Sequence, residues 1–276
     1  MRIDSHQHFW EFDKVVDPSW INDDMAILRQ DYLPSDVQPL MLKNGIEGCV
    51  AVQADQTEDE TRYLLGLAEQ YDIIKGVVGW VDFRSEQIKD RLDYFSTFKL
   101  LKGFRHIVQA EKEDDFLLRE DFCRGITLLQ DYSFTYDILI YPEHLKYAHE
   151  FVKRFPGQKF IIDHLAKPYI KEGLVDEWKK DLQVFGRYEN VYCKIAGLVT
   201  EADWKAWQIA DFTPYVSTVL DIFGTDRIIF GSDWPVCLPS ASYDQVCEIV
   251  EKTTSFLSGE EKEKLWGTNA VRFYNL

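Results

Sequence analysis

Short apolar runs recur along the chain, and longer segments with helical periodicity separate them. The runs are rich in β-branched residues, and this alternation is typical of βα units around a parallel sheet. The pattern predicts eight strands, at residues 1–6, 46–53, 74–82, 101–107, 135–141, 159–164, 190–196 and 227–233.

The segments between the runs predict crossover helices, among them residues 57–71, 143–155 and 169–187. Each is long enough to return the chain to the start of a parallel strand, and each carries mixed charge on one face. Eight such units predict closure into a (β/α)8 barrel of the TIM type. Spacing alone leaves an open doubly wound sheet as the alternative, although no glycine-rich phosphate loop follows the first strand.

We expect a single domain over residues 1–276, because no Pro/Gly/Ser-rich linker or fixed-period repeat divides the chain. Its final stretch predicts a capping helix at residues 258–273. That helix begins at Ser258, and Glu261 is placed three residues later for a capping box. The five cysteines lie at wide spacings without a C-x-x-C pair, and we interpret them as small, mostly buried hydrophobes.

Acidic residues outnumber basic ones. The 47 acidic and 31 basic side chains give a formal net charge of -16, which repels polyphosphates, so we expect no nucleic-acid partner. No apolar run is long enough to cross a bilayer, and the first residues lack the apolar stretch of a signal peptide. We expect a small-molecule substrate that is neutral or cationic, no membrane partner and a cytoplasmic location; a homo-oligomer is compatible with this composition.

Polar residues gather at the carboxyl ends of the predicted strands, which meet at one mouth of a parallel barrel. His6 and His8 close the first strand, and because strand side chains alternate, both imidazoles project to the same side. They are spaced to hold one metal ion or one substrate. Asp233 closes the eighth strand, which neighbours the first if the barrel closes.

Other predicted strand ends also carry polar side chains. His106, His164 and Gln53 end the fourth, sixth and second strands. Four of the six histidines therefore fall at strand ends, which independent placement would rarely produce. His144 and His149 lie within a predicted helix, and we interpret them as surface or packing residues.

Two cations lie in predicted strands. Arg105 precedes His106, and Lys194 lies in the apolar run VYCKI. A lysine there is costly unless it reaches a partner or points into the mouth. We interpret Lys194 as a substrate-binding group, and the alternative is an ion pair with Asp163 or a neighbouring carboxylate.

Aromatic side chains supply flat apolar faces with polar edges, which suit a sugar-like substrate. Four of them lie near predicted strand ends or in the loops that follow, namely Trp10, Trp80, Tyr141 and Trp234. Three others are interpreted as core residues, namely Trp178, Trp204 and Trp207.

Three segments carry a family resemblance: IDSHQH at residues 3–8, DHLAKP at 163–168 and FGTDRIIFGSDWP at 223–235. Together they resemble the amidohydrolase-related group called amidohydrolase family 2, over the whole chain. Further segments are similar to the sugar lactonases of that group, of the fuconolactonase and rhamnonolactonase types: QA at 53–54, GFRH at 103–106 and KIAGL at 194–198. The resemblance implies a barrel hydrolase that opens a cyclic ester.

The resemblance also bears on metal binding. Many members of the wider superfamily have a bridging lysine at the end of strand four and a histidine at the end of strand five, where this chain has His106 and Tyr141. We therefore expect at most one divalent ion, and three protein ligands with an open position suit catalytic zinc. Its expected ligands are His6, His8 and Asp233, with His164 as an alternative fourth. Some lactonases of this group work without a metal, so the ion is dispensable in one version of the hypothesis.

The resulting hypothesis is hydrolysis of an aldonolactone to its open acid, with Asp233 activating the attacking water. The groups expected to act on the developing charge are Arg105, His106 and His164. The groups expected to bind the sugar are Gln53, Trp80, Arg105, Tyr141, Lys194 and Trp234.

Three alternatives remain open. A nonoxidative decarboxylase of the same fold would use a similar histidine and aspartate set. A metal-free lactonase for an aromatic-derived dicarboxylate lactone would need several cationic groups in the mouth to bind its dianionic substrate. Arg105 and Lys194 are candidates for such groups, so this alternative stays open. A noncatalytic carbohydrate-binding barrel would keep the aromatic residues but has no need for a carboxylate beside paired histidines.

Overall fold

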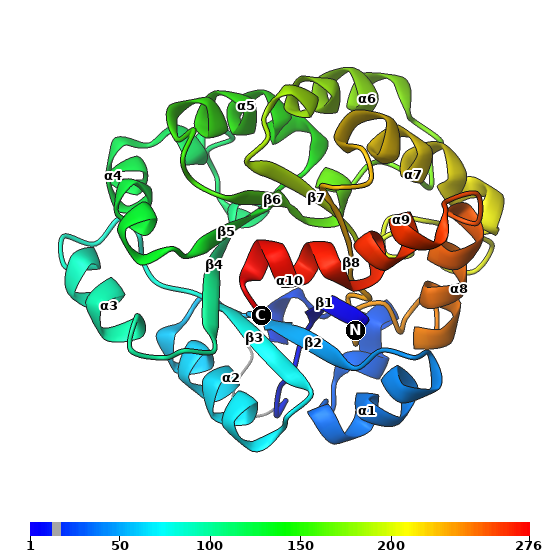
Figure 1. Cartoon of the computed structure of the whole chain (residues 1–276), viewed down its shortest axis with the longest axis horizontal. Helices are drawn as coiled ribbons and strands as arrows, with labels where there is room; N and C mark the ends of the chain where they lie inside the picture. The colour runs from blue at the N-terminus through cyan, green and yellow to red at the C-terminus, as the bar shows by residue number, and fades with distance from the viewer. Residues whose placement is uncertain (13–17) are drawn as a thin grey trace.

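The computed structural model describes residues 1–12 and 18–276, and at its centre eight parallel strands follow one another in sequence order (Figure 1). The strands are β1 (Ile3–Gln7), β2 (Gly48–Val52), β3 (Ile74–Gly79), β4 (Leu101–Ile107), β5 (Thr135–Leu139), β6 (Phe160–Ile162), β7 (Val191–Ile195) and β8 (Ile228–Phe230). All eight predicted strands are confirmed, and the largest differences lie at the ends of the third and eighth.

Within residues 1–12 and 18–276, eight α-helices surround the strands and two more follow the last of them (Figure 1). They are α1 (Pro34–Lys43), α2 (Glu58–Gln70), α3 (Ile88–Phe95), α4 (Glu120–Leu128), α5 (Leu145–Arg154), α6 (Asp176–Leu182), α7 (Ile209–Phe223), α8 (Tyr243–Thr253), α9 (Gly259–Glu263) and α10 (Asn269–Tyr274). The helix expected at 169–187 begins later, at Asp176, because turns occupy the residues after Pro168 and Gly173 adopts a φ of +68°.

Backbone and side-chain hydrogen bonds join the last strand region to the first. The Asp233 amide donates to the His6 carbonyl at 2.9 Å, and the His8 amide donates to the Trp234 carbonyl at 2.8 Å. The Ser5 hydroxyl donates to the Phe230 carbonyl at 2.6 Å. These contacts close the sheet, so the (β/α)8 barrel is confirmed and the open doubly wound sheet is excluded.

The barrel interior has an apolar part, which α10 covers at the amino-terminal ends of the strands. Figure 1 shows α10 lying across the centre of the barrel. Its Asn269 side chain donates to the carbonyls of Thr225 and Ile228, next to the start of β8. An apolar cluster joins α10 to the inward side chains of the strands: Ile3, Val50, Val52, Val78, Ile161, Ile229, Ala270, Phe273 and Tyr274.

The segment predicted as one capping helix consists of α9, a π-helical turn at Lys264–Thr268, and α10. Ser258 is the N-cap of α9 and accepts from the Glu261 amide, and the reciprocal bond of a capping box is present. The interruption lets α10 turn under the barrel.

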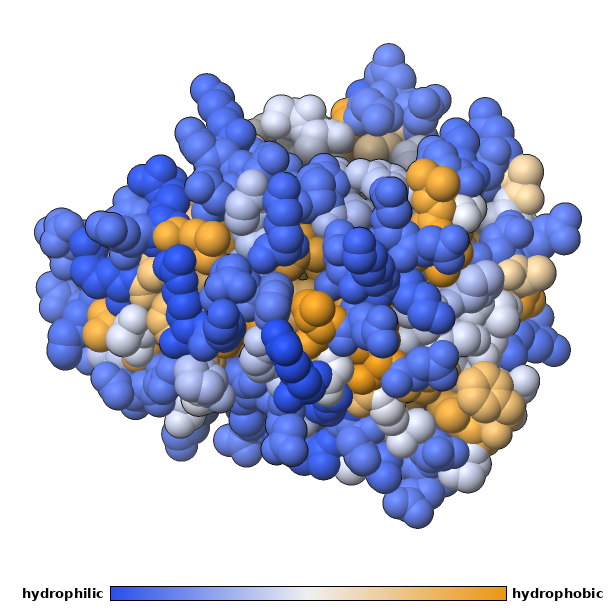
Figure 2. All heavy atoms as spheres, turned by 90° about the horizontal axis from the view of Figure 1, so that it is seen from above, coloured by the Kyte–Doolittle hydropathy of each residue, from blue (hydrophilic) through white to orange (hydrophobic). Residues whose placement is uncertain are grey.

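One face of the molecule is mostly polar. Figure 2 shows a face on which hydrophilic side chains predominate and apolar ones are scattered. Within the described residues, no helix has the length and apolar character needed to span a membrane. Cys49 and Cys193 are buried within strands and are free thiols, as expected.

Candidate active site

His6, His8 and Asp233 converge at the carboxyl-terminal mouth of the barrel. The Nε2 atoms of His6 and His8 lie 3.2 Å apart, because residues two apart on a strand project to the same side. Asp233 Oδ1 lies 3.3 Å from His8 Nε2 and 3.7 Å from His6 Nε2. Closure of the barrel therefore brings the three residues together.

The ring orientation of His8 is fixed by a backbone acceptor. Its Nδ1 lies 2.8 Å from the Val52 carbonyl oxygen at the end of β2. A carbonyl oxygen only accepts hydrogen bonds, so the neutral ring carries its proton on Nδ1. The lone pair of His8 Nε2 is then directed toward Asp233, as a metal ligand or a proton acceptor requires.

Asp233 has an unusual backbone conformation. Its φ of 59° lies in the left-handed region, which costs about 1 kcal/mol or more for a residue with a side chain. Burial by itself would raise the pKa of the carboxyl group, but interactions with His164 and His8 hold that pKa below its usual range. Asp233 is therefore a carboxylate at neutral pH.

His164 lies in a strained turn after β6. Residues 164–167 all have positive φ, between 50° and 58°. A Cβ added at Gly197 would lie 2.5 Å from His164 Nδ1, so this glycine makes room for the ring. Burial lowers the pKa of His164 to about 4, which makes the imidazole neutral at neutral pH. Its Nε2 lies 4.0 Å from Asp233 Oδ1.

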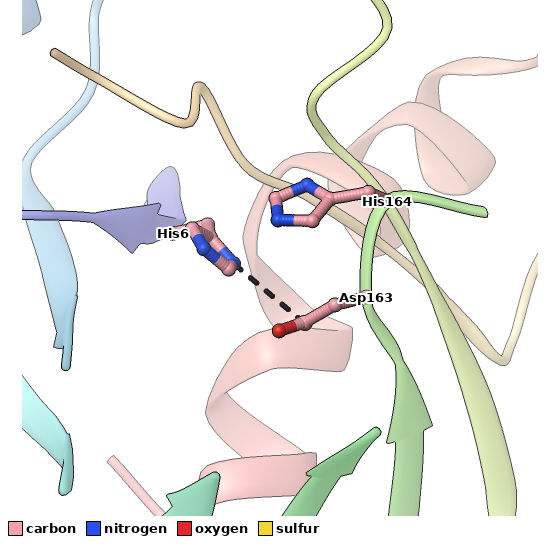
Figure 3. A group of neighbouring side chains, drawn as sticks. All are labelled: His6, Asp163 and His164. Atoms are coloured by element: carbon pink, nitrogen blue, oxygen red, sulfur yellow. Dashed lines mark ion pairs between the residues drawn. The ribbon is translucent and has the colours of Figure 1, made fainter. Parts of the chain in front are cut away.

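Asp163 and His164 form a second group of neighbouring side chains with His6 (Figure 3). Asp163 Oδ1 lies 3.6 Å from His6 Nδ1, and both side chains are fully buried. Asp163 Oδ2 accepts a hydrogen bond at 3.1 Å from Arg105, an inward-facing residue of β4. Arg105 also donates to the side chain of Gln53, with 3.1 Å between Nε and Oε1.

Lys194 does not reach the mouth, so the structure contradicts our interpretation of it as a substrate-binding group. Its Nζ lies 2.8 Å from Asp137 Oδ2 and 2.8 Å from Asp163 Oδ1, and its side chain is fully buried. Burial opposes the charged form, but the two carboxylates raise the pKa of Lys194 overall. The alternative, an ion pair with Asp163, is confirmed.

His106 points away from the barrel interior. Consecutive strand residues face opposite sides, so an inward Arg105 requires an outward His106. The ring stacks on Phe116, and its Nε2 lies 2.6 Å from a carboxylate oxygen of Glu111. Trp80 donates to His106 Nδ1 at 3.2 Å. Neither His106 nor Trp80 lines the cavity at the mouth, which contradicts the roles we predicted for them.

That cavity has a volume of about 550 Å³. The predicted site residues that line it are His8, Arg105, Tyr141, His164 and Asp233. His6 is buried beneath them, and Gln53 supports Arg105 rather than facing the cavity. Trp234, predicted to bind substrate, is buried against Phe9 and Tyr32 and does not line the cavity, because the backbone turn at Asp233 directs adjacent side chains apart.

Sequence reasoning missed several lining residues, all outside the strands: Trp20, Met25, Asp55, Gln56, Lys167, Glu201 and Trp204. Trp204 was interpreted as a core residue, and the structure places it in the cavity wall instead. Lys167 follows His164 in the segment DHLAKP, whose strained turn was not visible in the sequence. Loop residues carry no periodic pattern, so only their position after a strand end indicates the mouth.

The ligand spacing fits one metal ion. Zinc with bonds of about 2.0–2.2 Å in a tetrahedron separates neighbouring ligand atoms by about 3.3–3.6 Å. The atoms of His6, His8 and Asp233 lie 3.2 to 3.7 Å apart. A second group, His6 with Asp163 and His164, also clusters. Fixed cations contact His6 on both sides: Lys194 Nζ lies 3.2 Å from Nδ1 and also binds Asp163, and Arg105 Nη1 lies 3.1 Å from Nε2.

Comparisons with known proteins agree with this geometry. The amidohydrolase family model matches residues 3–276. A protein named L-fucono-1,5-lactonase from Burkholderia multivorans is 40% identical over 100% of this chain and 96% of its own length. One of the same name from Burkholderia ambifaria is 31% identical over 100% and 96%. The crystal structure of a Burkholderia multivorans amidohydrolase with bound zinc superposes with a TM-score of 0.95 at 39% identity, covering 100% of this chain and 99% of that one.

Proposed function

This chain belongs to the amidohydrolase family, and we propose that it hydrolyses the lactone of a sugar acid to the open acid. The observation that carries the proposal is the ionised Asp233 beside His8 and His164 at the base of the cavity. Two relatives named as L-fucono-1,5-lactonases, similar over the whole chain, support the same reaction.

Asp233 orients the attacking water and accepts its proton. The protein would hold one zinc ion through His6, His8 and Asp233, and the ion, when bound, lowers the pKa of water toward neutrality. His8 keeps its Nε2 lone pair directed at Asp233 because the Val52 carbonyl fixes its other nitrogen. His164, which is neutral, approaches the same carboxylate from the turn after β6.

Arg105 stabilises the charge that develops on the carbonyl oxygen. Arg105 lines the cavity, and bonds to Gln53 and Asp163 hold its guanidinium group before substrate arrives. Donors fixed in advance contribute more to the rate than donors that must reorient. His106 has no part in this step, because it faces away from the cavity.

The cavity wall suits a neutral, hydroxylated ring. Lys167 Nζ lies 3.7 Å from Glu201 Oε1 and 5.4 Å from the centre of the Tyr141 ring, which offers donors and acceptors beside a flat aromatic face. Asp55 adds a third carboxylate to those of Glu201 and Asp233. These acidic groups, and the neutralisation of Lys194, disfavour a dicarboxylate lactone and the anionic acids of a decarboxylase.

A panel of aldonolactones with a pH indicator tests the proposal, with zinc-loaded and chelator-treated protein side by side. We expect acid release from one stereochemical series and one zinc ion per chain. Release of carbon dioxide from aromatic acids, without hydrolysis of any lactone, would overturn it. The kcat of the chelator-treated protein tests the role of the ion, because an unchanged kcat without metal would assign water activation to Asp233 alone.

A further inference from the structure

The last helix of the chain contributes a polar group to the barrel interior. Tyr274, at the end of α10, is 1% exposed, and its hydroxyl group donates to Asp137 Oδ2 at 2.7 Å. Its neighbours Ala270 and Phe273 are apolar and pack against the inward side chains of the strands. The hydroxyl is therefore the one polar group that these three α10 residues present to the barrel.

Asp137 lies at the middle of β5, faces inward and is fully buried. The same oxygen that accepts from Tyr274 lies 2.8 Å from Lys194 Nζ. The Lys194 ammonium also lies 5.5 Å from the centre of the Tyr274 ring, over its face. The tyrosine thus contacts both members of this ion pair, one by a hydrogen bond and the other by its aromatic ring.

From Lys194 the contacts continue toward the cavity. Lys194 Nζ lies 2.8 Å from Asp163 Oδ1, and the other oxygen of Asp163 accepts from Arg105 at 3.1 Å. Arg105 lines the cavity. One connected series of buried polar groups therefore leads from α10, below the barrel, to a residue that lines the cavity.

We propose that Tyr274 is a positioning residue of the active site. Its hydroxyl fixes the Asp137 carboxylate, and Asp137 fixes the Lys194 ammonium. Lys194 in turn fixes Asp163, which sets the orientation of Arg105. The groups in this series are between 0% and 3% exposed, so water cannot replace a lost partner and a shift of one group is passed to the next. This inference rests on the proposed function for its kinetic test.

The alternative is that Tyr274 only fills space beneath the barrel. Its replacement would then lower stability and leave the chemistry unchanged. The two roles differ in whether loss of the hydroxyl reaches Arg105.

The variant Tyr274→Phe keeps the ring and deletes the hydroxyl. We expect kcat for the aldonolactone to fall by about 5- to 20-fold with KM within about 2-fold, because the change affects a group that acts in the transition state. Tyr215→Phe is the matched control: Tyr215 is 1% exposed, lies on α7, and donates its hydroxyl at 3.3 Å to the Tyr169 carbonyl. Wild-type kcat is expected for this control.

A double-mutant cycle tests whether the residues act in series. Asp137→Asn should lower kcat more than Tyr274→Phe does, and the double variant should be no slower than Asp137→Asn alone. Additive losses would mean that Tyr274 acts by a separate route. They would overturn the proposed series.

A spectroscopic measurement separates this inference from the proposed function. The Arg105 Nε–H signal, assigned by its loss in Arg105→Lys, should shift in the ¹⁵N–¹H spectrum of Tyr274→Phe and stay in place in Tyr215→Phe. An unmoved Arg105 signal overturns the positioning role, whatever the substrate is. A shifted signal in a protein that opens no lactone would overturn the proposed function and leave the positioning role intact.

Discussion

The two halves of the barrel interior differ in what fills them. Toward the amino-terminal ends of the strands, apolar side chains such as Ile161 and Ile229 pack against α10. Toward the carboxyl-terminal ends, the same strands and the turns after them carry His6, Asp163 and Lys194, which are buried and charged or titratable. The apolar half gains free energy from burial, whereas the charged half loses solvation and depends on each partner being present.

The largest expected effect lies in the charged half. Asp233→Asn keeps the shape of the side chain and removes the proton acceptor, so kcat for the lactone should fall by about two to four orders of magnitude. Steady-state kinetics and a melting curve on one preparation check this. Near wild-type kcat would make Asp233 structural.

Lys194→Met tests how far the charged half depends on its partners. Because Asp137 and Asp163 would both lose their buried cation, the free energy of unfolding should fall by about 3–5 kcal/mol. Ile161→Val in the apolar half is the comparison, with an expected loss of about 0.5–1.5 kcal/mol. Urea unfolding measures both. A Lys194→Met protein as stable as the wild type, with a raised KM, would return Lys194 to substrate binding.

The low pKa of His164 gives the charged half a pH dependence of its own. Its pKa is about 4 in the folded protein against an ordinary value of 6.5, so the unfolded chain binds a proton in that window that the folded protein does not. This contribution to stability is present above pH 6.5 and is lost as the pH falls toward 4. His164→Gln should therefore lose less stability between pH 7 and pH 4.5 than the wild type, in urea unfolding at each pH. Equal losses would contradict the buried neutral form.

A smaller effect is expected at the rim of the cavity. Glu201→Gln should lower kcat/KM by about 10-fold for a hydroxylated lactone, because a hydrogen bond to a charged acceptor contributes about 1.5–3 kcal/mol and one to a neutral acceptor about 1 kcal/mol. Unsubstituted δ-valerolactone has no such hydroxyl and should react as before. Glu172→Gln, on an exposed turn, is the control. Equal losses for both lactones would remove Glu201 from sugar recognition.

The fold followed from the sequence because its signal is periodic. Eight apolar runs separated by amphipathic segments predict strands and helices, and parallel strands place their carboxyl ends at one mouth. The same geometry predicted that His6, His8 and Asp233 would meet. The spacing of His6 and His8 follows from strand alternation, whereas the position of Asp233 also depends on the left-handed turn after β8, which the pattern does not contain.

The roles of individual site residues were predicted less well, because they depend on the direction in which each side chain points and on the groups that it contacts. Alternation already forbade Arg105 and His106 from sharing one face, yet we predicted both to act on the substrate. Lys194 faces inward as expected, but its height within the barrel decides whether it meets substrate or carboxylates. Trp204 and Lys167 lie in loops, where neither direction nor depth follows from a repeat.

The left-handed turn at residues 164–167 also bears on how this protein can be engineered. None of its four residues is glycine, and each costs about 1–2 kcal/mol in this conformation. The summed cost is comparable to the whole stability of an ordinary domain, about 5–15 kcal/mol. The substitution Ala166→Gly, at a buried position whose side chain carries no polar group, would relax the backbone and leave the imidazole of His164 chemically unchanged. Stability could therefore be raised by relieving the backbone strain of this turn, without changing the side chains of the active site.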